Sequence, residues 1–305
     1  MKLFVAVTDN DWYRFLASQP PLDEVNFWTP GGKPLANLAP GQPVLFKLHY
    51  PEHFIAGGGF FATFSVLPLS MAWETFGQKN GAATLDRMRR LIERRRTAAP
   101  DPREDYFIGC TILVEPFFLS PAEWIVPPPD FSANIVRGKS YSLQTPVGRN
   151  LWERVLGARR LVALATGEAG RQEIYADPTL VSRRLGQGAF RVLVTENYLR
   201  SCAVTGEKAL PVLQAAHIRP VSQGGSHSIT NGVLLRADLH ALFDRGYVTV
   251  TPKLEFLASR RLREDFDNGE AYLAMSGKRI WVPDDARKQP APELLEWHAN
   301  TIFKG

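Results

Sequence analysis

Three polar residues in the second half of the chain could carry out hydrolytic chemistry. His217 ends an apolar segment, Asn231 follows fourteen residues later, and His240 lies nine residues further on, at the start of an expected helix. An imidazole titrates close to neutral pH, so it can take a proton from water as a general base. A lone histidine in such a segment is more often a hydrogen-bonded core residue, but the joint spacing of these three indicates a site.

The residues around this trio extend the pattern. Ile218 and Pro220 follow the first histidine, Gly224 and Gly225 mark a loop, and the stretch NGVLLRADLH leads into the second histidine. Over about residues 186–260 the sequence resembles the HNH signature of the ββα-metal nucleases. The match is specific, because many separate positions agree in order and spacing.

The resemblance implies a role for each residue of the trio. His217 would take the proton from the attacking water, and His240 would bind a divalent ion, Mg²⁺ or Mn²⁺, that stabilises the leaving 3′-oxygen. Asn231 would brace the loop through hydrogen bonds from its side chain to the backbone and so hold the base in place. Asp238 would cap the helix or support the metal ion, and we therefore expect both His240 and Asp238 at the metal.

One position departs from the family pattern. Many HNH enzymes have an aspartate or histidine directly before the general base as a second metal ligand, and this chain has Ala216 there. Asp238, His227 or Asp244 would complete the metal shell, or the ion would keep more water. The structural alternatives are that His227 is a surface residue of the loop and that Asp244 caps the helix or pairs with Arg245.

The spacing of apolar residues predicts an α+β chain. In the first half it indicates strands at 3–7, 44–48, 60–66 and 106–115, and helices at 9–17 and 84–96. In the second half it indicates strands at 212–217 and 233–235, a helix at 238–243 and a hairpin at 246–258. We place an N-terminal domain at 1–160, a linker at 161–185, where the chain becomes polar and less periodic, and a C-terminal domain at 186–305.

The first half contains a second, looser family pattern. Leu38 and Gly41 precede the apolar run VLFK, and the segment 55–62 contains three consecutive glycines. This arrangement resembles the PUA-like β-barrel superfamily, whose EVE, YTH and SRA members bind nucleic acid and take a flipped, often modified base into a pocket. It implies an N-terminal PUA-like barrel with flanking helices, beside the C-terminal ββα-metal domain.

The PUA-like resemblance also implies an aromatic cage for the base. Trp28 and Trp73 fall at places comparable to the two stacking rings of YTH-type members, Asn26 would read an edge of the base, and Trp12 would form a third wall. Such rings return part of the stacking energy that a base loses when it leaves a duplex. The alternative is that these tryptophans fill the core of the domain, as most aromatic residues do.

Arginines are concentrated in two segments, although the formal net charge of the chain is only +5. Residues 81–100 contain six arginines, and residues 137–160 contain five arginines and one lysine. Cations near phosphates release counterions, so these segments suit a polyanionic partner, although either could be a solvated surface. We expect phosphate contacts from Arg87, Arg90, Arg94 and Arg219.

The remaining sequence features bear on the compartment. The two cysteines, Cys110 and Cys202, are too few and too distant for a disulfide framework or a zinc knuckle. The N-terminal MKLFVAV reaches the polar TDND at once, so it is read as a strand rather than a signal peptide, and no apolar stretch is long enough to span a bilayer. We expect a cytoplasmic protein without membrane association.

The two resemblances together imply a modification-dependent, type IV-like restriction endonuclease. The N-terminal domain would recognise 5-methylcytosine or 5-hydroxymethylcytosine in double-stranded DNA, while the HNH site would contact mainly the backbone. Because one HNH site cuts one strand, we expect a homodimer for a double-strand break. Two alternatives stay open: a non-catalytic reader whose HNH site is degenerate at Ala216, and an HNH nuclease regulated by a small ligand in its N-terminal domain.

Overall fold

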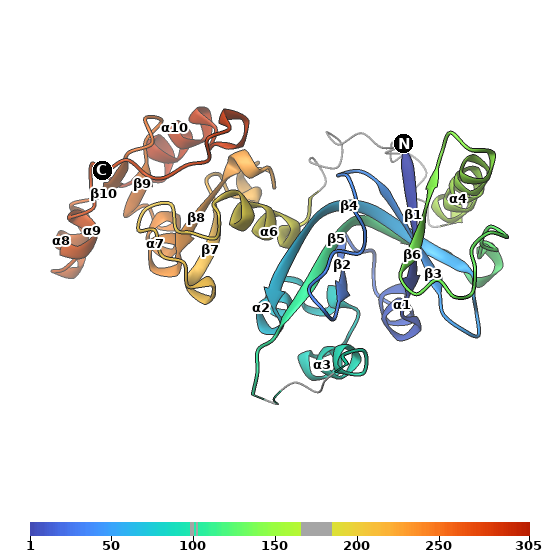
Figure 1. Cartoon of the computed structure of the whole chain (residues 1–305). Helices are drawn as coiled ribbons and strands as arrows, with labels where there is room; N and C mark the ends of the chain where they lie inside the picture. The colour runs from blue at the N-terminus through green and yellow to red at the C-terminus, as the bar shows by residue number, and fades with distance from the viewer. Residues whose placement is uncertain (98–100, 102, 166–184) are drawn as a thin grey trace. The chain divides into compact units, whose positions relative to one another are not determined.

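The computed structural model describes residues 1–97, 101, 103–165 and 185–305, which form two compact units (Figure 1). The units span Met1–Gly186 and Gln187–Gly305. The N-terminal domain was expected to end at residue 160, but helix α4 (Pro146–Ala165) continues past this position. Most of the expected linker at 161–185 lies outside the described residues.

A six-stranded mixed sheet forms the centre of the N-terminal unit, with the strand order β2-β5-β4-β3-β1-β6. Its strands are β1 (Lys2–Thr8), β2 (Glu24–Thr29), β3 (Pro43–Leu48), β4 (Ile55–Pro68), β5 (Phe107–Phe118) and β6 (Gly138–Ser142). β1 and β3 are parallel, and all other neighbouring strands are antiparallel. The four strands expected from the sequence are present, and β2 and β6 are additions.

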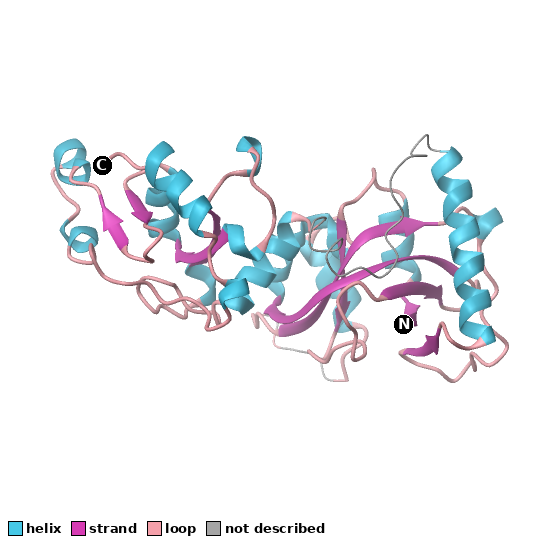
Figure 2. Cartoon of the chain, turned by 90° about the horizontal axis from the view of Figure 1, so that it is seen from above, coloured by secondary structure: helices cyan, strands magenta, loops and turns pink. Residues whose placement is uncertain are grey.

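The expected closed barrel does not form within the described residues. Closure requires hydrogen bonds between the edge strands of a sheet, and here the edges, β2 and β6, pair with β5 and β1 alone. After β6 the chain turns into α4 at Pro146, so β6 is followed by a helix rather than by a strand that could join the edges. Register shifts between β4 and β5 accompany the bend of these long strands, which leaves an open, curved sheet (Figure 2).

Local capping signals explain where the helices of this unit begin. Asp9 precedes α1 (Asn10–Ala17) and accepts a 2.8 Å hydrogen bond from the backbone N–H of Trp12. Thr84 caps α3 (Leu85–Glu93) in the same way, through the N–H of Arg87. Between them, α2 (Leu69–Phe76) follows β4 directly and continues into the short 3-10 helix η1 (Gly77–Asn80).

The C-terminal unit has the strand–strand–helix order that the sequence predicts. β7 (Leu213–His217) and β8 (Gly232–Arg236) are antiparallel, and α7 (Ala237–Asp244) follows β8 without a loop. The other elements are α6 (Gln187–Asn197), β9 (Val248–Val250), β10 (Phe256–Ala258), α8 (Arg261–Phe266), α9 (Glu270–Leu273) and α10 (Pro292–Thr301). Phe190 and Val194 of α6, Val233 of β8, and Leu239 and Phe243 of α7 lie in one buried cluster, which fixes α7 against the strand pair.

No helix among the described residues is long and apolar enough to cross a membrane.

Candidate functional site

His217 lies at the end of β7, half-buried, with its ring held on two sides. It stacks on Phe190 of α6, with ring centroids 3.8 Å apart and planes within 12° of parallel. Its Nε2 atom lies 3.1 Å from Nδ1 of His227, in the loop between β7 and β8. The sequence identified His217 but not Phe190, because the stacking joins segments that are 27 residues apart.

The surroundings of His217 keep its imidazole neutral. The pKa of His217 falls to about 4, mainly through burial and also through the nearby imidazoles of His227 and His240, while Asp244 acts in the opposite direction. At neutral pH the ring therefore has one nitrogen lone pair available to accept a proton.

Asn231 is fully buried and spans the loop that follows His217. Its Oδ1 accepts a 2.9 Å hydrogen bond from the backbone N–H of Arg219, and its Nδ2 donates to the carbonyls of Arg219 and Ser226 at 2.9 and 2.8 Å. Gly225 lies so close that a Cβ there would stand 1.9 Å from the Arg219 carbonyl oxygen and 2.9 Å from Asn231 Nδ2. The amide thus ties both ends of the loop together, and the loop needs glycine at 225 to close over it.

His240 lies on the first turns of α7 with both ring nitrogens near an oxygen. Nδ1 lies 2.7 Å from Oε1 of Gln214 on β7, and Nε2 lies 3.3 Å from Oδ2 of Asp244, one helical turn further along α7. Because an amide oxygen only accepts, Nδ1 carries the proton, and Nε2 is the nitrogen that faces the carboxylate. Gln214 was not expected at the site. The sequence does contain a signal for it: residues two apart on a strand share a face, so Gln214 lies on the same face as Ala216, the position where many HNH enzymes have a second metal ligand.

Asp238 points into a different set of contacts. Both its oxygens accept 2.7 Å hydrogen bonds from Arg236, and Oδ2 also accepts from the hydroxyl of Tyr272 at 3.1 Å. The hydrogen bond from Arg236 is the main reason that the pKa of Asp238 falls to about 2. The expected place of Asp238 at the metal stays a prediction: in this structure Asp238 is held by Arg236 and Tyr272, and Asp244 is the carboxylate beside His240.

Comparison with known families places these residues in one domain. The HNH endonuclease family matches residues 202–251, a segment that contains β7, β8 and α7 together with His217, Asn231 and His240. The chain contains an HNH endonuclease domain.

Two solved structures resemble the chain only weakly overall. One is an ASCH protein mutant from Zymomonas mobilis, with 9% identity, 49% of this chain and 96% of that chain covered, and a TM-score of 0.31. The other is described as a modification-dependent TagI restriction endonuclease, with 13% identity, 98% and 81% covered, and a TM-score of 0.30. Scores of this size do not establish a common fold, and no curated protein matches the chain.

The HNH domain offers two ligands suited to a divalent ion. His240 Nε2 and Asp244 Oδ2 are 3.3 Å apart, close to the separation of about 3 Å between adjacent ligands of an octahedral ion with bonds of about 2.1 Å. The described residues contain no group of three or more His, Cys, Asp and Glu side chains that could hold a metal. An ion held by these two residues would therefore keep water or phosphate oxygens as its other ligands, which is the usual way that proteins bind Mg²⁺.

Arg219 follows the HNH-domain strand β7 and is held at the edge of the site. Its Nε donates a 2.6 Å hydrogen bond to the carbonyl of Gln223, and its guanidinium lies 5.2 Å from the ring centre of Trp297 on α10. These contacts orient the guanidinium and leave some of its N–H groups for other acceptors.

Three of the four residues expected to form the cage, Trp12, Trp28 and Asn26, are buried in the core of the N-terminal unit. Trp12 and Trp28 are 2% and 7% exposed, and their indole N–H groups donate to the backbone carbonyls of Asn26 and Asn80. The Asn26 side chain is fully buried and donates to Asn80 Oδ1, while Trp73 is half-buried on α2. The expectation of an open cage fails for Trp12, Trp28 and Asn26, because these side chains fill the space between the sheet and α1, α2 and η1.

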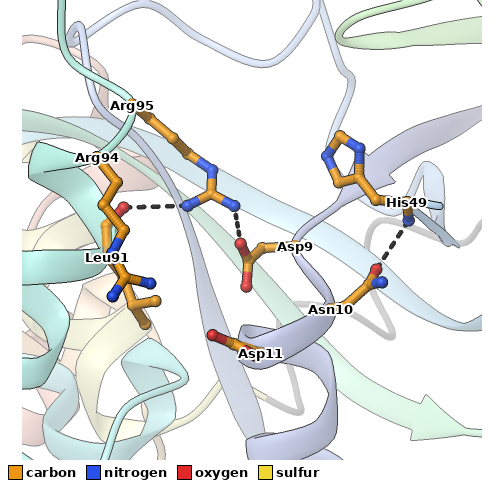
Figure 3. A pocket seen from close by; sticks show the side chains of 7 residues that line it. All are labelled: Asp9, Asn10, Asp11, His49, Leu91, Arg94 and Arg95. Atoms are coloured by element: carbon orange, nitrogen blue, oxygen red, sulfur yellow. Dashed lines mark hydrogen bonds and ion pairs between the residues drawn. The ribbon is translucent and has the colours of Figure 1, made fainter. Parts of the chain in front are cut away.

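A surface cavity of about 500 Å³ lies elsewhere in this unit, beside the start of α1, the end of β3 and the end of α3 (Figure 3). It is lined by Asp9, Asn10, Asp11, His49, Leu91, Arg94 and Arg95. Arg95 pairs with Asp9 and donates to the carbonyl of Leu91, so its charge is satisfied within the cavity wall (Figure 3).

The arginines of α3 and of its C-cap, Arg94, fall into two groups. Arg87 pairs with Asp11 at 3.1 Å, and Arg89 lies 3.7 Å from Glu93. Arg90 and Arg94 are exposed and form no ion pair within the part of the chain that the structure describes. Of the three arginines of this segment that were expected to bind phosphate, Arg87 is thus engaged by a carboxylate, while Arg90 and Arg94 are not in the described contacts.

Proposed function

We propose that this chain is a metal-dependent endonuclease that hydrolyses phosphodiester bonds of DNA in its HNH domain. One observation carries the proposal: the neutral imidazole of His217 lies in the same small site as the His240–Asp244 pair, within the segment that matches the HNH family. A base and a metal-binding pair at one place are the two components that phosphodiester hydrolysis requires.

In this proposal the side chains have separate tasks. His217 accepts the proton of the attacking water on a ring nitrogen. His240 and Asp244 hold the divalent ion, which supplies charge neutralisation at the scissile phosphate when it is bound. Asn231 keeps the loop after β7 closed through its three backbone hydrogen bonds, and Arg219 supports a phosphate from the edge of the site.

Incubation of supercoiled plasmid with the protein and Mg²⁺ or Mn²⁺ tests this proposal. We expect nicked or linear product that requires the ion and disappears when a chelator is added. A protein that leaves plasmid intact with every divalent ion would instead support the non-catalytic alternative, in which Ala216 marks a degenerate site.

We propose further that the N-terminal unit selects DNA that carries a modified cytosine. Two features support this: the sequence resemblance of the first half to PUA-like readers, and the exposed Arg90 of α3 and Arg94 at its C-cap, which form no ion pair among the described residues and suit a DNA backbone. A reader that binds its base by flipping would have to use a surface other than the space between Trp12 and Trp28, since both are packed in the core.

Digestion of matched duplexes tests this second proposal. DNAs with cytosine, 5-methylcytosine, 5-hydroxymethylcytosine or methyladenine at the same positions should be cut at different rates, with a modified cytosine preferred. Equal rates on all four DNAs would contradict the proposal that the N-terminal unit selects a modified cytosine. In that case a small ligand becomes the better hypothesis for this unit, and the cavity lined by Asp9 and Arg95 is where to look for it, since its size is in the usual range for small molecules.

Because one HNH site cuts one strand, we also propose that two copies of the chain act together on a double-strand break. Sedimentation of the protein with and without DNA, read beside the ratio of nicked to linear plasmid, tests this.

A further inference from the structure

In the described contacts, the ring of the expected general base, His217, lies closer to His227 than to Asn231 or His240, the other two residues of the HNH pattern. Its Nδ1 lies 3.1 Å from Nε2 of His217, the two ring centres are 5.1 Å apart, and the rings are inclined by 62°. The His227 ring also lies 5.7 Å from Phe190, the ring on which His217 stacks. From the sequence, His227 was expected to be a surface loop residue or a metal ligand. Its contact with His217 indicates a different role.

The backbone on both sides of His227 is fixed. The carbonyl of Ser226, the residue before it, accepts the 2.8 Å hydrogen bond from Asn231 Nδ2. Ser228, the residue after it, accepts at its Oγ from the backbone N–H of Thr230 and lies 2.9 Å from the Thr230 hydroxyl. The buried Asn231 therefore fixes the backbone next to His227, and His227 contacts His217. Through these two contacts, the bracing of the loop by Asn231 also positions the general base.

A hydrogen bond between two imidazole nitrogens contains one proton, and its position decides whether the neutral His217 can act. If His227 donated from Nδ1, Nε2 of His217 would be the acceptor and its own proton would stand on Nδ1, so no lone pair would be left for water. If His217 donates from Nε2–H, its Nδ1 keeps a lone pair and can accept the proton of a water molecule. Only the second arrangement gives a base.

We infer that His227 is a positioning residue, which accepts a hydrogen bond from Nε2–H of His217 and so holds His217 in the tautomer with a free Nδ1. This inference rests on the proposed nuclease function. When water transfers a proton to Nδ1, His217 becomes an imidazolium and the water becomes hydroxide. The Nε2–H···Nδ1 bond to His227 is then charge-assisted and stronger, so it stabilises the base in the state that it reaches during the reaction.

Asparagine and leucine at position 227 form a matched pair of variants for the test. The side-chain oxygen of asparagine can take the place of Nδ1 as an acceptor, whereas leucine has nearly the same shape and no acceptor. We expect His227→Leu to lower kcat about 10- to 100-fold with KM for DNA unchanged, the usual cost of losing an orienting partner of a catalytic imidazole. His227→Asn should stay within about threefold of the wild type, and both variants should melt at the wild-type temperature.

Nitrogen-15 NMR of the His217 ring gives a readout that does not depend on cleavage. In the full-length protein without metal, we expect protonated Nε2 and unprotonated Nδ1 in the wild type and in His227→Asn, and a mixture of tautomers in His227→Leu. A wild-type His217 with its proton on Nδ1 would overturn the inference, as would a His227→Leu protein with wild-type kcat and the wild-type tautomer. If the wild type cuts no DNA but the tautomer changes as expected, the nuclease proposal fails and the positioning of His217 by His227 stands.

Discussion

Two histidines of the C-terminal unit, His217 and His298, have almost the same surroundings but different expected roles, one in the reaction and one in stability. His217 stacks on Phe190 at 3.8 Å and His298 on Phe243 at 3.7 Å, each with nearly parallel rings, and burial lowers the pKa of both to about 4. His298 is only 2% exposed, with Nδ1 2.8 Å from the Thr249 hydroxyl and Nε2 3.2 Å from the carbonyl oxygen of Phe243. In His217, Nε2 faces His227, while Nδ1 has no hydrogen-bond partner among the described residues.

The two rings differ in whether one nitrogen remains without a hydrogen-bond partner in the described residues. A depressed pKa shows that a histidine is neutral, but a ring with both nitrogens engaged by the protein can only support structure. A ring with one nitrogen free, beside a pair of metal ligands, can also act on a bound molecule. The comparison therefore predicts that replacing His217 affects rate and that replacing His298 affects stability.

The largest effect is expected from His217→Ala. Loss of a general base typically lowers the rate about 10²- to 10⁴-fold, so we expect kcat for plasmid cleavage to fall about a thousandfold. The melting temperature should change little, since the ring is half-buried and stands at the rim of the core. Cleavage at the wild-type rate by this variant would remove His217 from the mechanism and leave it a structural residue like His298.

The next effect concerns the two carboxylates of α7, Asp244 and Asp238. We expect Asp244→Asn to weaken Mn²⁺ binding about 10- to 100-fold, because it removes a charged ligand next to His240 Nε2. Asp238→Asn is the matched control, in which metal affinity stays the same and the melting temperature falls through loss of the contacts to Arg236 and Tyr272. Titration of the protein with Mn²⁺, followed by the signal of the free ion, measures both.

The opposite result, weaker binding for Asp238→Asn alone, would mean that the carboxylate leaves Arg236 when the ion binds. The metal pair expected from the sequence would then be correct.

The difference between these carboxylates also shows what sequence patterns can predict. Local signals were sufficient where a few adjacent residues decide the structure, as with the strand–strand–helix order around His217 and His240. The partner of Asp238 could not be predicted in this way, because Tyr272 lies 34 residues away and is brought close only by the folded unit. The contact of His227 with His217 likewise depends on the path of the loop 218–231 between β7 and β8.

The N-terminal unit also shows a limit of prediction from sequence, here for residue type rather than for partners distant in the chain. Trp12 and Trp28 have the residue type of a base cage, and residue type alone cannot tell a cage from a core. Their indole N–H groups are satisfied by backbone carbonyls of β2 and η1, and those contacts arise only when α1 and α2 pack on the sheet. Strand β2 itself was missed, since EVNFWT mixes charged and polar residues that become buried only beside β5.

A smaller effect is expected from His298→Gln, on stability. Because the pKa of His298 is about 4 in the folded chain and about 6.5 when unfolded, the unfolded chain binds more protons between these values. Lowering the pH from 6.5 towards 4 therefore favours unfolding. By pH 5 this histidine should cost the wild type about 2 kcal/mol of unfolding free energy, a loss that the variant avoids.

Urea unfolding of wild type and His298→Gln at pH 7 and pH 5, followed by signals of the C-terminal unit, measures this difference. Cleavage at pH 7 should stay within about twofold of the wild type, since His298 is buried and both its ring nitrogens contact other residues of the protein, Thr249 and Phe243. A variant that loses cleavage but keeps its stability would reverse the assignment of the two histidines.

The smallest effect tests whether the same distinction holds among the arginines of α3 and its C-cap. Arg87 is engaged by Asp11, whereas Arg90 and Arg94 are exposed and without an ion pair among the described residues, so only the latter two have charge to offer a phosphate at no cost to an existing contact. Each phosphate neutralised contributes about 0.9 to the slope of log affinity against log salt concentration. The double variant Arg90→Gln, Arg94→Gln should therefore bind DNA with a slope shallower by about 2, measured without metal so that no cutting occurs, and Arg87→Gln should leave the slope nearly unchanged. Equal changes in both proteins would mean that Arg87 exchanges Asp11 for a phosphate on binding, and an unchanged slope in both would place the DNA on another face of this unit.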